Sequence, residues 1–163
     1  MRQSAANAAR LAGGKAQPGI ADGALAHLED ELAARMRELA FLNKGIRLTI
    51  TDERQPDENG KFSTETFYSE TGLKDFIEYL DVNREALIPD PINIEGERNS
   101  IPIEIAMQYN TSFAENIHAY VNNINTHEGG THLSGFRSAL TRSINDYAKK
   151  NNLIKGEMVL SGE

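Results

Sequence analysis

The chain has 163 residues, of which 39% are hydrophobic and 25% charged, so it is long enough for one domain with a hydrophobic core and too short for two. Its formal net charge of −7 argues against a surface that binds nucleic acid throughout, because such domains are usually basic. The absence of cysteine excludes disulfides and thiolate metal sites. The sequence has no apolar run long enough to span a bilayer and no secretory signal, so we expect no membrane span and a cytoplasmic location.

The first segment, residues 1–23, is predicted to be a flexible or unrelated leader. It is rich in alanine and glycine and carries Arg2, Arg10 and Lys15 against one acidic residue, Asp22. A transit peptide has a similar composition, so the sequence leaves that alternative open.

Residues 24–45 are predicted to form an amphipathic helix. Leucine and methionine side chains recur every three or four residues between Leu25 and Leu42, and charged side chains such as Glu38 lie off this stripe. Gly45 follows the last apolar position, so we expect the helix to end there.

The next two segments are predicted to pair as a β-hairpin. Apolar and polar side chains alternate over residues 46–50, and residues 62–68 contain a second strand pattern. The connecting loop contains Pro56 and the turn-forming pair Asn59 and Gly60. A short loop of this composition between two strands is typical of a hairpin.

A short helix and two strands are predicted next. Residues 73–80 place their apolar side chains on one helical face, with Thr71 as the expected N-cap. After a segment with two prolines, residues 92–94 show a weak strand pattern and residues 101–109 a clear one, with apolar side chains at every second position. This alternation indicates an antiparallel sheet with one face exposed to solvent.

The last part of the chain is predicted to contain a strand, a glycine turn and a long helix. Residues 114–121 alternate as a strand does, residues 122–130 form the turn, and Thr131 is the expected N-cap of the helix that follows. Residues 155–163 are predicted to form a turn and a last short strand. The expected apolar stripe of the helix consists of Leu133, Phe136, Leu140, Ile144 and Tyr147.

The order of these elements predicts an α+β fold. A helix, two strands, a helix, three strands and a helix arrange as two layers, with the helices on one face of the sheet. The sequence contains no internal repeat or heptad array that would favour a solenoid or a coiled coil.

Three long sequence motifs identify a family. They are LAARMRELAFLNKGIRLTITDER at residues 32–54, IPIEIAMQYNTSFAENI at residues 101–117 and NNINTHEGGTHLSGFRSALTRSINDYA at residues 122–148. In this order they closely resemble the transducer domain, which is the second domain of the ATPase subunit of bacterial type IIA topoisomerases, DNA gyrase B and its topoisomerase IV counterpart. The resemblance covers residues 28–163 and favours the gyrase B form.

The resemblance implies a fold and a domain organisation. Transducer domains have a ribosomal-protein-like fold with a left-handed βαβ crossover, although right-handed crossovers are the rule elsewhere. Residues 24–45 would be the helix that leads from an absent ATPase domain, and residues 46–163 a transducer domain that is incomplete at its C-terminus. We therefore expect a fragment that is truncated at both ends.

The resemblance also implies the function of the complete subunit. In the family, which consists of ATP-hydrolysing isomerases, the transducer couples ATP binding and hydrolysis in the preceding domain to DNA strand passage. ATP and magnesium belong to that complete subunit, and its partners are duplex DNA, a second copy of the subunit and the gyrase A-type subunit. The family's nucleotide motifs do not occur in these residues, so we predict no catalytic, cofactor or metal site and expect the fragment alone to be inactive.

Three histidines and a glycine pair near the turn could support chemistry. A metal site would use His118, His127 and His132, but their spacing does not match paired helical ligands, so ordinary turn and strand histidines are the alternative. Gly129 and Gly130 before a helix could form an anion-binding nest or simply a tight turn.

Three basic residues of the long helix, Arg137, Arg142 and Lys149, are candidates for contact with DNA. Arg137 lies at the border of the predicted apolar stripe, and in the family the arginine of this motif lines the cavity through which the duplex passes. The alternative is a structural role for Arg137, such as an ion pair with Glu104. Arg142 and Lys149 would add a rim that makes weak, phosphate-directed contacts.

A second class of function stays open. The chain could be a free-standing interaction module from a split or decayed gene that docks on a topoisomerase subunit or on nucleic acid, because a fold does not by itself decide function. The DNA on either side of the coding sequence would separate these alternatives.

Overall fold

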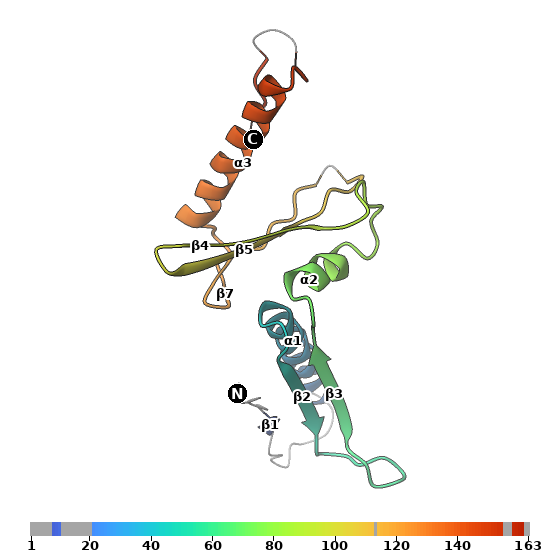
Figure 1. Cartoon of the computed structure of the whole chain (residues 1–163). Helices are drawn as coiled ribbons and strands as arrows, with labels where there is room; N and C mark the ends of the chain where they lie inside the picture. Colours follow the sequence, from blue (N-terminus) through green and yellow to red (C-terminus); the bar gives the residue numbers. More distant parts are fainter. Residues whose placement is uncertain (1–7, 11–20, 113, 155–157, 162–163) are drawn as a thin grey trace. The chain divides into compact units, whose positions relative to one another are not determined.

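The computed structural model describes residues 8–10, 21–112, 114–154 and 158–161. The chain divides into two compact units, residues 1–113 and 114–163, and each is described by itself. The first unit contains β1 (Ala8–Arg10), α1 (Ala21–Leu42), β2 (Arg47–Asp52), β3 (Ser63–Tyr68), α2 (Leu73–Leu80), β4 (Ile92–Arg98) and β5 (Ile101–Met107), and the second contains β6 (Tyr120–Val121), β7 (Ile124–Asn125) and α3 (Thr131–Lys150) (Figure 1). In the described ranges, no helix combines the length and the apolar character that a membrane span requires.

The structure is a mixture of helices and small, mainly antiparallel sheets. The single sheet that the sequence predicts is divided into three among the described residues: β1–β2–β3, β4–β5 and β6–β7. The antiparallel pairs join strands that are adjacent in sequence, because closing a short loop costs less conformational entropy than bringing distant strands together.

Part of the stretch predicted as a leader has regular structure. β1 pairs in parallel with β2, in a register that places Ala8 opposite Thr49. α1 begins at Ala21 rather than at residue 24. The remaining residues of this stretch, 1–7 and 11–20, lie outside the described residues.

α1 packs against the β2–β3 hairpin to form the core of the first unit. Met36 and Ala40 on α1 and Phe67 on β3 are buried, with exposed fractions of 6%, 2% and 5%. Burial of an apolar side chain the size of methionine or phenylalanine contributes about 1.5–3 kcal/mol, so this contact holds the helix and the hairpin together. The half-buried side chains packed around it are Leu32, Ala33, Leu48 and Ile50.

The end of α1 confirms the predicted glycine stop. The helix ends at Leu42, and the Asn43 side chain donates to the carbonyl oxygen of Leu39 at 2.8 Å. Gly45 has a φ of 83°, a conformation that favours glycine, and its N–H donates to the carbonyl oxygen of Ser69 at 2.8 Å. This turn therefore joins the end of α1 to the end of β3.

The predicted β2–β3 hairpin is confirmed. The last pair of its antiparallel register is Asp52 opposite Ser63. Two hydrogen bonds join Asp57 and Lys61 in the loop. The Asp57 N–H donates to the Lys61 carbonyl oxygen, and the Lys61 N–H donates to Asp57 Oδ1, both at 2.7 Å. Gly60 takes the positive φ of 74° that the turn requires.

α2 is confirmed over Leu73–Leu80, but its predicted N-cap is wrong. The N-cap is Gly72, the residue after Thr71. Its φ of 72° is a positive backbone angle that favours glycine. The Thr71 hydroxyl donates instead to the Asp75 carboxylate, and the Gly72 N–H donates to Ser69 Oγ at 2.8 Å. Side chains on both sides of the turn, Ser69 and Asp75, thus hold the chain where it enters α2.

β4 and β5 form a hairpin that confirms both predicted strands, although β5 ends at Met107 rather than at residue 109. Arg98 pairs with Ile101, which leaves Asn99 and Ser100 as the two turn residues. Their φ values of 53° and 61° are those of the two-residue turns that suit the twist of a hairpin. One face of the hairpin keeps apolar side chains exposed, namely Ile92, Ile94, Ile101 and Ile103.

In the second unit, the strand predicted over residues 114–121 is largely wrong. Only Tyr120 and Val121 form a strand, β6, which pairs with β7 across a turn at Asn122 and Asn123 with φ values of 49° and 64°. Alternating side chains do not create a ladder without a partner strand, and among the described residues of this unit the partner is the two-residue β7.

α3 confirms the predicted long helix, and its N-cap corrects the prediction. The helix runs from Thr131 to Lys150 and has Gly130 as its N-cap, with no side-chain cap bond. Thr131 is the first helical residue rather than the N-cap, because the helix begins one residue earlier than predicted.

The apolar stripe of α3 is only partly confirmed. Ile144 and Tyr147, which belong to the predicted stripe, are 39% and 64% exposed, whereas Asn145 and Ala148 are 7% and 6% exposed. The cause is the segment 158–161, which contains no strand in its described residues but is hydrogen-bonded to the Asn145 side of the helix. The other residues of the predicted last strand, 155–157 and 162–163, lie outside the described residues.

Candidate functional site

The three basic residues predicted to face DNA lie on α3 but do not form one cluster. At 100° per residue, Arg142 and Lys149 lie about 20° apart around the helix axis, whereas Arg137 lies about 140° from Arg142. Arg142 and Lys149 are exposed and Arg137 is half-buried. The helix therefore presents Arg142 and Lys149 on one face and Arg137 on another.

Arg137 forms an ion pair within the second unit. Its Nη2 donates to Glu115 Oε2 at 2.7 Å, and the two side chains are 42% and 61% exposed. Glu104, the partner suggested from the sequence, is therefore not the observed one; Glu115 lies five residues before β6, in the same unit as the helix. Arg137 Nε is buried and has no acceptor among the described residues, so the guanidinium keeps donor capacity beyond this ion pair.

The histidines near the turn contact neutral side chains. His118 Nε2 lies 3.1 Å from Asn116 Oδ1, and His132 Nε2 lies 3.3 Å from Thr126 Oγ1. Over the part of the chain that the structure describes, no three histidine or carboxylate side chains are grouped in a way that could hold a metal ion.

The glycine pair forms a tight turn into α3. Gly129 has a φ of 77°, and its N–H donates to the Thr126 carbonyl oxygen at 2.7 Å. The Gly130 carbonyl oxygen accepts from the Ser134 N–H at 3.0 Å, as the first bond of the helix. A Cβ added at Gly130 would lie 2.9 Å from the His132 ring, so this ring approaches the second glycine closely.

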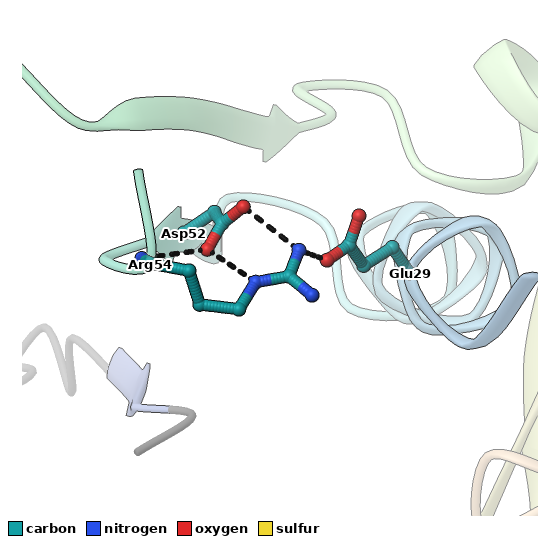
Figure 2. A network of polar contacts seen from close by, with 3 residues as sticks. All are labelled: Glu29, Asp52 and Arg54. Atoms are coloured by element: carbon teal, nitrogen blue, oxygen red, sulfur yellow. Dashed lines mark hydrogen bonds and ion pairs between the residues drawn. The ribbon is translucent and has the colours of Figure 1, made fainter. Parts of the chain in front are cut away.

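A charged cluster at the end of β2 was not singled out in the sequence, although Arg54 closes one of its motifs. The Nε and Nη2 groups of Arg54 donate to the two oxygens of Asp52, both at 2.8 Å. Nη2 also contacts the Glu29 carboxylate on α1, so the guanidinium bridges helix and hairpin (Figure 2). The Asp52 contact is local and could have been anticipated, whereas the contact with Glu29 depends on how α1 packs.

A second charged contact joins the end of α1 to β4. Lys44 Nζ lies 2.6 Å from Glu95 Oε1, and Glu95 lies directly opposite Glu104 in the register of β4 and β5. The hydrogen bond to Glu95, followed by the charges of Glu104 and Glu95, raises the pKa of Lys44, and the same hydrogen bond lowers the pKa of Glu95. The lysine thus offsets the repulsion between two like charges on paired strands.

Arg37 links α1 to two other elements through its guanidinium. The guanidinium carbon lies 5.2 Å from the centre of the Phe67 ring and 5.8 Å from that of Tyr79 on α2. One of its nitrogens lies 3.0 Å from Glu65 Oε1 on β3. Through Arg37, Arg54 and Lys44, α1 and the residues that follow it are therefore connected to the β2–β3 hairpin, to α2 and to β4 in the first unit.

Comparison with known proteins identifies the family of the chain. A family model described as DNA gyrase B matches residues 72–163, which is more than half of the sequence. The DNA gyrase B subunits of Cytophaga aurantiaca and Halalkalibacterium halodurans are each 53% identical to it over 135 residues, and that of Streptococcus pneumoniae is 48% identical over 135 residues. These matches cover 82% of this chain but only 28%, 20% and 20% of the relatives, so the chain spans less than a third of their length.

Solved structures of gyrase B share the fold. The 43K ATPase domain of Thermus thermophilus gyrase B, crystallised with an aminocoumarin, matches with a TM-score of 0.68 and 31% identity over 79% of this chain and 34% of that chain. The B-subunit of the DNA gyrase from Myxococcus xanthus matches with a TM-score of 0.65 over 74% of this chain and 33% of that chain, and at 21% identity it shows likeness of fold alone. The predicted resemblance is thereby confirmed, and the chain belongs to the DNA gyrase B family of type IIA topoisomerase subunits.

Proposed function

We propose that this chain is the transducer portion of a gyrase-type subunit and that it couples ATP binding and hydrolysis to DNA strand passage. The observation that carries the proposal is the 53% identity over 135 residues to DNA gyrase B subunits that are several times longer. ATP and magnesium would bind in the preceding domain of the complete subunit. Its partners would be duplex DNA, a second copy of the subunit and the gyrase A-type subunit, in the cytoplasm.

The contacts of α1 support a mechanical role for residues 24–45. The buried core and the guanidinium groups of Arg37 and Arg54 attach α1 to its hairpin at several points along the helix. A preceding domain that moves α1 would therefore move the hairpin with it. Residues 46–163 would pass this movement on, and we expect the left-handed βαβ crossover of the family in a crystal structure of the complete domain.

The basic residues of α3 support a weak contact with DNA. Arg142 and Lys149 are exposed on one helix face, and the Arg137 side chain is 42% exposed on another. These groups suit phosphate oxygens, which fix position without reading sequence. A net charge of −7 keeps the overall affinity for DNA low. Low affinity suits a domain that lines the cavity through which the duplex passes and must release it.

The test is the activity of the complete coding sequence. We would read the DNA on both sides of this segment, express the full reading frame with the gyrase A-type subunit, and measure supercoiling and decatenation of plasmid with and without ATP. The proposal predicts an upstream ATPase domain and an ATP-dependent change in DNA topology. A reading frame that stops near these residues, between unrelated genes, would support the free-standing interaction module instead.

A further inference from the structure

Asn145 is a buried polar residue in the middle of α3. Only 7% of it is exposed, and asparagine is unfavourable in a helix interior because its amide competes for backbone hydrogen bonds. In α3 the amide contacts the carbonyl oxygen of Thr141 in its own helix and also reaches a segment fifteen residues further along the chain. A residue that weakens its own helix calls for a compensating contact.

The compensating contact is a double hydrogen bond to the backbone of Leu160. Asn145 Nδ2 donates to the Leu160 carbonyl oxygen at 2.9 Å, and the Leu160 N–H donates to Asn145 Oδ1 at 2.8 Å. The second hydrogen of Nδ2 is used by the Thr141 carbonyl oxygen at 2.9 Å, which holds the amide in one orientation. The side chain thus pairs with Leu160 as a neighbouring strand would, with one donor and one acceptor.

The side chains around this contact contribute little burial. Met158 and Val159 are each 62% exposed and Leu160 is 41% exposed, so apolar packing does not fix the segment on the helix. Asparagine is the residue whose short side chain offers a donor and an acceptor together. Aspartate would place a second acceptor against the Leu160 carbonyl, and alanine would leave both backbone groups unpaired.

We propose that Asn145 is a positioning residue that locks residues 158–161 onto α3, so that this segment moves with the helix as one body. The Asn145 lock is a feature of the second unit alone and stands without DNA or nucleotide. The role of this lock in coupling ATP hydrolysis to strand passage rests on the function proposed above. If α3 moves during that coupling, residues 158–161 would move with it.

Amide hydrogen exchange of the ¹⁵N-labelled full chain tests the lock. We expect the Leu160 amide to exchange about tenfold more slowly, or slower still, than the Val159 amide, for which the described residues provide no acceptor, after correction for intrinsic rates. Equal rates at the two positions in the wild-type chain would overturn the proposal before any variant is made. No DNA or nucleotide is present, so this result is independent of the proposed function.

Two variants and a matched control separate the lock from helix stability. Asn145→Ala and Asn145→Leu both remove the acceptor of the Leu160 N–H, so they should remove most of the Leu160 protection while α3 amides keep rates within about twofold of wild type. Asn151→Ala is the control, because Asn151 Nδ2 donates to the Tyr147 carbonyl oxygen at 2.8 Å and, among the described residues, makes no hydrogen bond to residues 158–161. Retained Leu160 protection in both Asn145 variants, or equal acceleration throughout α3, would show that Asn145 only supports the helix.

Discussion

At the scale of single residues, Arg137 is where the structural and the DNA-binding interpretations diverge. We predict that Arg137→Ala lowers residual duplex binding at low salt and reduces the slope of log K against log salt by about one, because one phosphate contact is lost. The melting temperature should stay nearly constant, since an exposed ion pair such as the one with Glu115 contributes about 0–1 kcal/mol. Fluorescence anisotropy with a labelled duplex at several salt concentrations measures the slope.

Glu115→Gln is the matched control for this experiment. It removes the charge that holds Arg137 but keeps the arginine, so DNA binding should be unchanged or stronger than in wild type. A dissociation constant tighter than the non-specific range of about 10⁻⁴ to 10⁻⁶ M at physiological salt would contradict weak phosphate contact. A salt slope that Arg137→Ala leaves unchanged would remove this residue from the proposed DNA-facing set.

Asp75 gives a prediction about pH. Desolvation raises the pKa of its carboxyl, but hydrogen bonds from Ser69 and Thr71 outweigh it, and the pKa lies below the ordinary value of 3.8. A lowered folded-state pKa means that the stabilisation is present above pH 3.8 and is lost as the pH falls below it. Asp75→Asn should therefore cost about 1 kcal/mol at pH 7 and less near pH 3, because hydrogen bonds to a charged group are stronger than neutral ones.

Urea denaturation at the two pH values measures this difference. Glu78→Gln, on the same helix and exposed, is the control and should change stability little at either pH. An Asp75→Asn effect that is the same at pH 7 and pH 3 would show that the carboxylate charge does not stabilise the turn before α2.

At the scale of elements, the contact between α1 and the β2–β3 hairpin depends on one aromatic side chain. Phe67 is 5% exposed and belongs to the core with Met36 and Ala40, so we predict that Phe67→Ala costs about 3–5 kcal/mol and detaches α1 from its hairpin. Phe62→Ala is the control, because Phe62 precedes β3 and is 43% exposed. Circular dichroism during chemical denaturation compares the two variants, and equal losses would contradict this core.

Elements with a strong local pattern were predicted well, whereas their ends and partners were not. α1, α2 and α3 follow from apolar periodicity, and the β2–β3 hairpin follows from its turn residues. The caps of α2 and α3 were misplaced by one residue, because Gly72 and Gly130 set the backbone path before each helix. The strand over residues 114–121 is reduced to β6, because among the described residues of the second unit only the two-residue β7 pairs with it.

At the scale of the whole molecule, the chain should not bind nucleotide by itself. The relatives that it matches are longer, and the resemblance places ATP and magnesium in the domain that precedes this one. Titration calorimetry with a non-hydrolysable ATP analogue and magnesium should give no measurable heat of binding for this chain. The complete subunit under the same conditions is the positive control, and micromolar affinity of the chain alone would contradict its assignment as a transducer fragment.

The sequence by itself determined the helices, the first hairpin, the mixed fold class and the family, because periodicity, turn chemistry and long motifs are properties of neighbouring residues. Only the tertiary structure decided which distant groups meet: Arg137 with Glu115, Arg54 with Glu29 and Asn145 with Leu160. It also decided that the buried side of α3 passes through Asn145 rather than Ile144. The physical reason is that each of these contacts depends on how the chain returns upon itself, and residues of the same type elsewhere in the sequence could have formed them equally well.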